Sequence, residues 1–183
     1  MIPALIIQSV NGHTSPELST SRDAHTITGV DAGEDGPTRG PRGYDEVGQA
    51  KKAGNFGWPY FIADNKAYNA YNYKTGESGA LFDPEKPIND SQNNTGLREL
   101  PPAQPAMIWY HYGETPEFPQ VGSGGRNAMA GPVYYTDMFP KETSLPEYYN
   151  GKFIAYEWMR GWISAVTFDD NGDFSKMEPF APN

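Results

Sequence analysis

The chain has 183 residues and no cysteine, and 23 acidic against 14 basic side chains give it a formal net charge of −9. The missing cysteine excludes disulfides, thiolate catalysis, cysteine-ligated zinc or iron–sulfur sites, and haem attached through a C-x-x-C-H motif. The acidic balance argues against nucleic acid and anionic membrane surfaces as partners, because both repel negative charge. No apolar run approaches the ~20 residues of a membrane-spanning helix, so we expect no membrane insertion.

The composition favours many short strands joined by structured turns. Glycine (20 residues) and proline (17 residues) are abundant, and 14% of the chain is aromatic. Glycine and proline shape turns but are costly inside helices, and aromatic side chains can supply much of a β core. The expected fold class is therefore all-β.

The first 30 residues differ from the rest of the chain. They are polar, rich in Ser and Thr, and lack sustained strand alternation. We predict that residues 1–30 form a weakly ordered lead-in and that residues 31–183 form the folded domain. The apolar start, residues 1–10, has no preceding Lys or Arg and no clear cleavage site, so we expect no signal peptide here.

The middle of the sequence indicates loops more than strands. Residues 31–43 are dense in Gly and Pro and predict a loop. Residues 56–62 form an aromatic, strand-like run, but Pro59 inside it suggests a strand end or a sheet edge. Residues 64–105 contain few β-branched side chains and much Asn, Asp, Pro and Gly, which predicts a long insertion or a series of loops.

The clearest strands come later. The dipeptide Asn171-Gly172 favours a type I′ hairpin turn, which needs positive φ at both central residues. Together the strands from 131 to 178 predict a four-stranded antiparallel meander of the size of one propeller blade. The expected strands are residues 106–112, 131–137, 151–157, 162–168 and a final one near 173–180.

One segment resembles the glucose/sorbosone dehydrogenase family. Residues 40–61, GPRGYDEVGQAKKAGNFGWPYF, contain a Gly-Pro turn, then Asp-Glu, an apolar residue, and Gly-Asn-Phe-Gly-Trp-Pro, in the order found in that family. Residues 129–174 are similar to a later blade of the same fold. The resemblance covers roughly residues 31–180.

The resemblance implies a six-bladed β-propeller and an aldose dehydrogenase that uses pyrroloquinoline quinone and Ca²⁺. Six blades of ~40–50 residues need a longer chain, so we expect a partial propeller of about three four-stranded blades. The resemblance also implies a periplasmic or secreted parent protein, a sugar or glycan substrate, and in some relatives a c-type cytochrome module.

The resemblance carries over to particular residues. The carbonyls of Gly40 and Pro41 match the turn that supplies Ca²⁺ ligands, and Asp45 is placed to support that ion. Arg126 and Arg160 are the predicted contacts to the carboxylates of the quinone, because a guanidinium binds carboxylates through paired hydrogen bonds. Each of these residues can also have a purely structural role.

No catalytic residue is assigned. The family's catalytic histidine lies in an early blade, and no histidine of this chain matches it. We therefore expect a fragment that does not oxidise aldoses alone, although the complete parent protein does. Two alternatives are a non-catalytic segment that binds glycans through exposed aromatic side chains and an interaction fragment without a ligand. Open strand edges further predict self-association.

Overall fold

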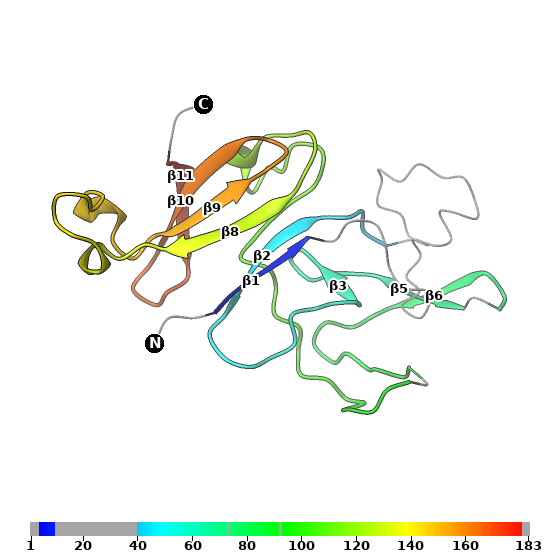
Figure 1. Ribbon diagram of the computed structural model, residues 1–183. Coiled ribbons are helices and arrows are strands. Elements are labelled where there is room, and N and C mark those ends of the chain that lie inside the picture. The colour runs from blue at the N-terminus through cyan, green and yellow to red at the C-terminus, as the bar shows by residue number, and fades with distance from the viewer. Residues whose placement is uncertain (1–3, 10–39, 73, 92, 181–183) are drawn as a thin grey trace. The chain divides into compact units, whose positions relative to one another are not determined.

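The computed structural model describes residues 4–9, 40–72, 74–91 and 93–180 (Figure 1). The chain divides into two compact units, Met1–His111 and Tyr112–Asn183, and each is described by itself. Both consist of antiparallel strands and irregular segments, with short 3₁₀ turns in the second unit. The all-β prediction is confirmed.

The first unit is built on a three-stranded antiparallel sheet with the order β1-β2-β7. In its register Val47 pairs with Ile108 and Asp45 with Tyr110. These four side chains share one face of the sheet and are buried, and the pair on the opposite face, Glu46 and Trp109, is buried as well, so the centre of the sheet is enclosed on both faces. The strands are β1 (Ala4–Ser9), β2 (Asp45–Ala50) and β7 (Ile108–Tyr110).

Two small hairpins and a long irregular segment follow β2. The hairpins are β3 (Phe61–Ile62) with β4 (Lys66–Ala67), and β5 (Asn69–Asn72) with β6 (Glu77–Leu81). Asparagine side chains support the irregular parts: the Asn94 Nδ2 donates to the carbonyls of Asn89 and Leu97. The predicted loop region 64–105 thus contains three short strands in addition to its loops.

The second unit is a four-stranded antiparallel meander with the order β11-β10-β9-β8 (Figure 1). Its core includes Phe153, Ala165, Val166 and Met177. Each predicted strand is found within a few residues of its expected place. The strands are β8 (Ala128–Val133), β9 (Phe153–Glu157), β10 (Trp162–Phe168) and β11 (Phe174–Pro179).

The hairpin between β10 and β11 differs from the predicted type I′ turn. Of its residues only Gly172 has a positive φ, 75°. Its N–H donates to the Asp169 carbonyl, while the Asp169 carboxylate accepts from the N–H groups of Asn171 and Asp173. The aspartate side chain therefore selects a longer loop, which the dipeptide alone does not predict.

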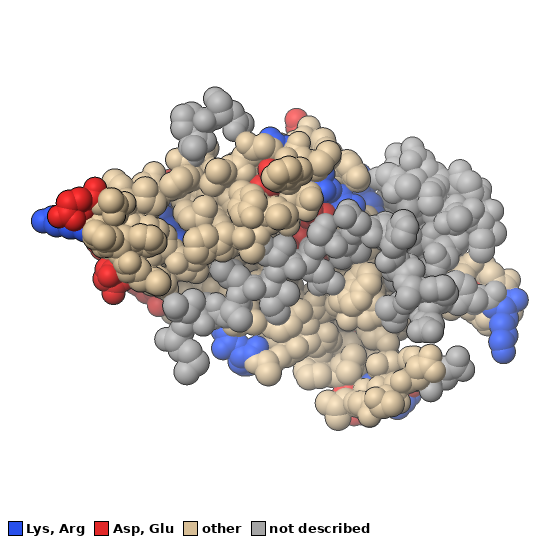
Figure 2. Space-filling view, viewed as in Figure 1, with Lys and Arg blue, Asp and Glu red and all other residues tan. Residues whose placement is uncertain are grey.

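Residues 134–150 form an excursion between β8 and β9. Its two ends meet where the Gly151 N–H donates to the Tyr134 carbonyl at 2.7 Å. It contains η2 (Thr136–Met138) and η3 (Glu147–Tyr149), and η1 (Pro119–Val121) precedes β8. Figure 1 shows the excursion extending beyond the sheet, and Figure 2 shows charges of both signs at its tip.

Four-stranded sheets were expected throughout the domain. Among the residues described, one sheet has four strands, one has three and two have two. β1 lies inside the predicted lead-in and pairs with β2, while residues 10–30 of that lead-in are outside the described part. The coarse prediction of short antiparallel sheets is confirmed, and the assignment to propeller blades stays a prediction.

Candidate functional site

The predicted calcium turn leads directly into β2. Gly40 has a φ of 74°, the left-handed region that glycine adopts without strain, and Pro41 after it is buried. Asp45, the first residue of β2, is fully buried. The sequence-predicted group therefore lies in a well-packed part of the first unit.

This group does not make a complete calcium site. Two carbonyls and one carboxylate provide only about half of the six to eight oxygen ligands that Ca²⁺ takes. Within the described ranges no three His, Cys, Asp or Glu side chains are grouped to hold a metal. We derive no chemical step through calcium on these residues.

Glu46, beside Asp45, is a buried carboxyl to which the sequence assigns no role. It accepts a hydrogen bond from the Ala63 N–H. Burial raises the pKa of Glu46 to about 7; the bond from Ala63 opposes that rise and the charge of Asp45 adds to it. No sequence pattern indicated this burial, because neighbouring residues of a strand such as Glu46 and Val47 point to opposite faces.

The bond from Ala63 fixes a tight turn between β3 and β4. Ala63 and Asn65 have φ values of 59° and 67°, which are rare for residues other than glycine. The Asn65 Nδ2 donates to the Ala103 carbonyl at 3.0 Å. Glu46, within residues 40–61, thus binds the turn that follows this segment, and the Asn65 amide joins the same turn to Ala103.

His111 was the single histidine within the resembling region. Its ring lies 5.4 Å from that of Tyr44 in an edge-on contact, and Tyr44 contacts Trp109 in the same way. The Nζ of Lys66 lies 5.0 Å from the Trp109 ring centre. His111, which directly follows β7, thus belongs to an aromatic cluster, and this packing indicates a structural role.

Arg160 lies in the turn between β9 and β10. Its guanidinium donates to the carbonyls of a neighbouring loop of the same unit, and its N–H donates to the buried carboxylate of Glu157. The loop carbonyls belong to Val121, Gly122, Gly124 and Gly125. The predicted contact of Arg160 with a quinone carboxylate stays a prediction, and the structure shows its donors engaged within the chain.

Arg126 is the second predicted cation, and it lies at the end of that loop. It is 8% exposed, and its guanidinium carbon is 4.9 Å from the centre of the Tyr112 ring. Such a distance is typical of a cation–π contact. Arg126 therefore places a positive charge beside an aromatic side chain that is itself 61% exposed.

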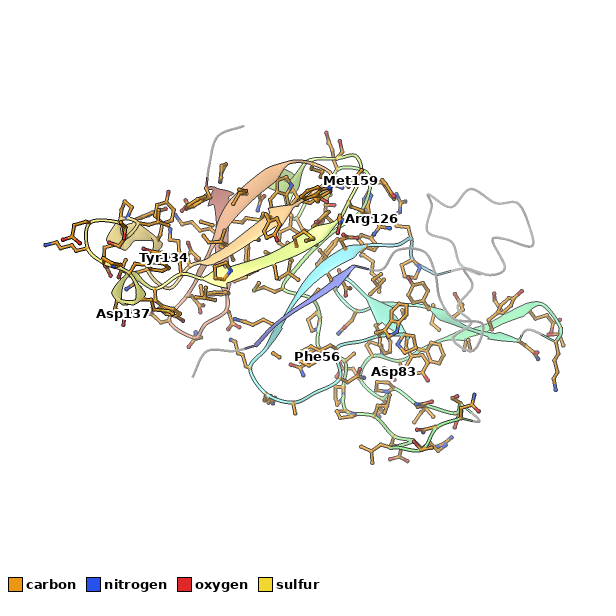
Figure 3. All side chains as sticks on the ribbon, viewed as in Figure 1. Phe56, Asp83, Arg126, Tyr134, Asp137 and Met159 are labelled. Atoms are coloured by element: carbon orange, nitrogen blue, oxygen red, sulfur yellow. The ribbon has the colours of Figure 1, made fainter. Side chains whose placement is uncertain are left out.

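Two further exposed side chains belong to the same end of the sheet. Trp158 and Met159, in the β9–β10 turn, are 71% and 62% exposed. The side chain of Met159 packs over Gly125, and Figure 3 shows Met159 close to Arg126. The N–H of Trp158 donates to the Asn127 carbonyl. We call Tyr112, Arg126, Trp158 and Met159 the aromatic–arginine surface.

A second cluster joins the β8–β9 excursion to β11. The Glu178 carboxylate accepts hydrogen bonds from the Tyr148 hydroxyl, from Lys152 at 2.9 Å and from Lys176 at 3.0 Å. These bonds lower the pKa of Glu178 to about 2, the bond from Tyr148 most of all. The donors of Tyr148, Lys152 and Lys176 thus bind a carboxylate of the same unit, which indicates a structural role for the cluster.

Comparison with known proteins adds no relative: no protein family, no curated protein and no solved structure matches this chain. The described part of the chain also has no helix long and apolar enough to cross a membrane.

Proposed function

We propose that this chain is part of a quinoprotein sugar dehydrogenase of the glucose/sorbosone dehydrogenase type. The β8–β11 sheet would be one blade of its propeller. The support is the meander order and the similarity of residues 129–174 to a family blade. In this proposal the parent protein is exported and passes its electrons to a cytochrome module or another acceptor.

The aromatic–arginine surface is the observation that carries the functional part. A buried guanidinium over an exposed tyrosine ring offers stacking area and positive charge together. Trp158, also exposed, is joined to the residue after Arg126 by the bond from its N–H to the Asn127 carbonyl. Pyrroloquinoline quinone is planar and carries three carboxylates, so it presents the complementary features. Arg126 would pair with a carboxylate, and Tyr112 and Trp158 would contact the ring or the sugar.

The described residues do not supply a complete set of groups for aldose oxidation. When bound, the quinone accepts the hydride of the sugar, and a base must lie within hydrogen-bond reach of the adjoining hydroxyl. His111, the one histidine within the described ranges, is packed against Tyr44. The calcium ligands are also incomplete. We therefore propose that this chain contributes one side of the site and does not turn over sugar by itself.

Quinone binding to the whole chain tests the ligand assignment. Titration with pyrroloquinoline quinone, followed by tryptophan fluorescence, should show saturable binding that Arg126→Gln weakens by about tenfold or more, the value of a charge-assisted hydrogen bond. Arg98→Gln is the matched control, because Arg98 is paired with Asp90 on the surface of the other unit. No saturable binding, or equal loss in both variants, would overturn the assignment.

A glycan-binding segment without catalysis is the second candidate. The exposure of Trp158 and Tyr112 favours it, because such rings stack on sugar faces. In that case soluble oligosaccharides would bind without the quinone, and Trp158→Ala would abolish binding while Arg126→Gln leaves it nearly unchanged. A larger loss of binding in Arg126→Gln than in Trp158→Ala would support quinone binding instead.

A further inference from the structure

The loop that leads to Arg126 is rich in glycine, so its own residues contribute little to a fixed conformation. Residues 121–127, with the sequence VGSGGRN, contain three glycines, and we call this segment the glycine loop. Gly122 and Gly124 have φ values of 68° and 110°. Glycine loses more conformational freedom on folding than any other residue, so a fixed structure here needs strong contacts from outside the loop.

Arg160 supplies those contacts. Its Nε donates to the Gly125 carbonyl at 2.8 Å, its Nη1 to those of Val121 and Gly122 at 3.0 and 2.7 Å, and its Nη2 to that of Gly124 at 3.3 Å. A guanidinium has five N–H donors, and these four bonds engage most of them. One side chain thus binds four carbonyls of the loop.

Two neighbours of Arg160 fix the ends of the loop. Glu157, 2% exposed, accepts hydrogen bonds from the N–H groups of Asn127 and of Arg160 itself. The Trp162 indole N–H donates to the Val121 carbonyl at 3.1 Å. The β9–β10 turn therefore holds the loop at its first residue, along its length and at its last residue.

Converging carbonyls carry partial negative charge and in other proteins hold a hard cation. A guanidinium can take that place because it is always charged, planar and only weakly hydrated. Lysine would be a poorer replacement, since its ammonium has three donors on one compact point charge. The number and spread of the carbonyls match a guanidinium better than an ammonium.

We propose that Arg160 is a positioning residue, an internal cation that orders the glycine loop and so holds Arg126 over the Tyr112 ring. Its role is to build the aromatic–arginine surface. The consequence for ligand affinity rests on the proposed function, whereas the ordering of the loop does not.

Chemical rescue of Arg160→Ala in the full chain is the test. The reporter is hydrogen exchange of the Gly124 amide, whose N–H donates to the Tyr112 carbonyl at 2.7 Å. Losing several bonds to a charged group should speed this exchange on the order of 100-fold. Methylguanidinium, at concentrations far below those that denature proteins, should restore slow exchange, and methylammonium at the same concentration should not. Arg160→Lys should fall between wild type and Arg160→Ala.

Two results would overturn the inference: wild-type exchange at Gly124 in Arg160→Ala, or equal rescue by methylguanidinium and methylammonium. If Arg160→Ala does not fold, refolding is compared with and without methylguanidinium. Recovery with it supports the inference. No recovery, together with wild-type exchange in Arg160→Lys, contradicts it. Quinone binding measured in parallel separates the two claims, because a wild type that binds no quinone contradicts the proposed function but leaves guanidinium rescue intact.

Discussion

Backbone conformation is the main constraint at the scale of single residues. Ala63 and Asn65 adopt positive φ in the three-residue connection between β3 and β4, which costs roughly 1–2 kcal/mol for a residue with a Cβ. The carboxylate of Glu46 and the carbonyl of Ala103 accept hydrogen bonds from this connection. The strain is therefore compensated by contacts that come from distant parts of the same unit.

Asn65 allows the two contributions to be separated. Asn65→Ala loses the bond to Ala103 and places a less tolerant residue in the left-handed region, so we expect a loss of about 2 kcal/mol of unfolding free energy. Asn65→Gly loses the bond but relieves the backbone, and should cost about 1 kcal/mol. Urea unfolding measures both. Equal stability of the two variants would show that the backbone of residue 65 is not strained.

Gly131 is a position where space, not φ, requires glycine. A Cβ there would lie 2.3 Å from the Ile154 carbonyl oxygen of β9. Gly131→Ala must shift β8 and should destabilise the protein by about 2 kcal/mol, the usual cost of overpacking. Gly96→Ala is the control, because its nearest neighbour would be the Asn94 Oδ1 at 3.6 Å. Equal melting temperatures of the two variants in thermal unfolding would contradict the close packing at Gly131.

At the scale of elements, buried apolar side chains stabilise the sheet of the second unit, whereas side-chain hydrogen bonds support the short strands of the first unit. Phe153, Ala155 and Glu157 are buried in alternation along β9, whereas β10 buries consecutive residues in its middle. Both strands lie close to their predicted places. β3 falls at the end of the strand-like run predicted at residues 56–62, whereas β4 to β6 were not predicted, because they are short and lie among Asn, Asp and Gly residues that favour turns. Their existence depends on contacts such as Asn69 Nδ2 to the Gly79 carbonyl, which no local pattern shows.

In the candidate site, too, some features were predicted from the sequence and others were not. The family-like motif and the two arginines were found from the sequence, since their residue types are distinctive. The partners were not: neither the carbonyls around Arg160 nor the hydrogen bond between Glu46 and Ala63 follows from spacing along the chain. Such partners come from segments 17 to 39 residues away, and tertiary folding brings them together.

The Glu178 cluster makes the attachment of η3 to β11 sensitive to acid. The pKa of Glu178 is lowered from 4.5 to about 2 in the folded protein, so its contribution to stability is complete above pH 4.5 and is lost as the pH falls toward 2. Glu178→Gln should therefore be less stable than wild type at neutral pH, and this difference should vanish across that window. Urea unfolding of both proteins along the pH series is the measurement; a difference that stays constant would contradict the ionic role of Glu178.

At the scale of the whole molecule, the second unit ends in open edges. β8 and β11 each have a neighbouring strand on one side among the described residues, and Gly131-Pro132 in β8 is the kind of interruption that limits pairing. Exposed Trp158 and Met159 add apolar surface. A blade of a larger propeller would normally be covered by its neighbours.

We therefore expect the isolated chain to self-associate. Light scattering should show a mass that rises with protein concentration, and replacing Trp158 and Met159 together by serine should reduce the rise, since exposed apolar surface drives association. A monodisperse monomer at high concentration would contradict the partial propeller.

Dye reduction by the reconstituted chain tests the proposed function most directly, namely the proposal that this chain contributes one side of a sugar-oxidising site and does not oxidise sugar by itself. The protein is incubated with pyrroloquinoline quinone, Ca²⁺ and glucose, and an artificial electron acceptor reports oxidation. The account predicts a rate equal to that of the free quinone, with no difference between wild type and Arg126→Gln. Turnover above that background, lost in Arg126→Gln but kept in Arg98→Gln, would contradict it and make the chain an enzyme in its own right.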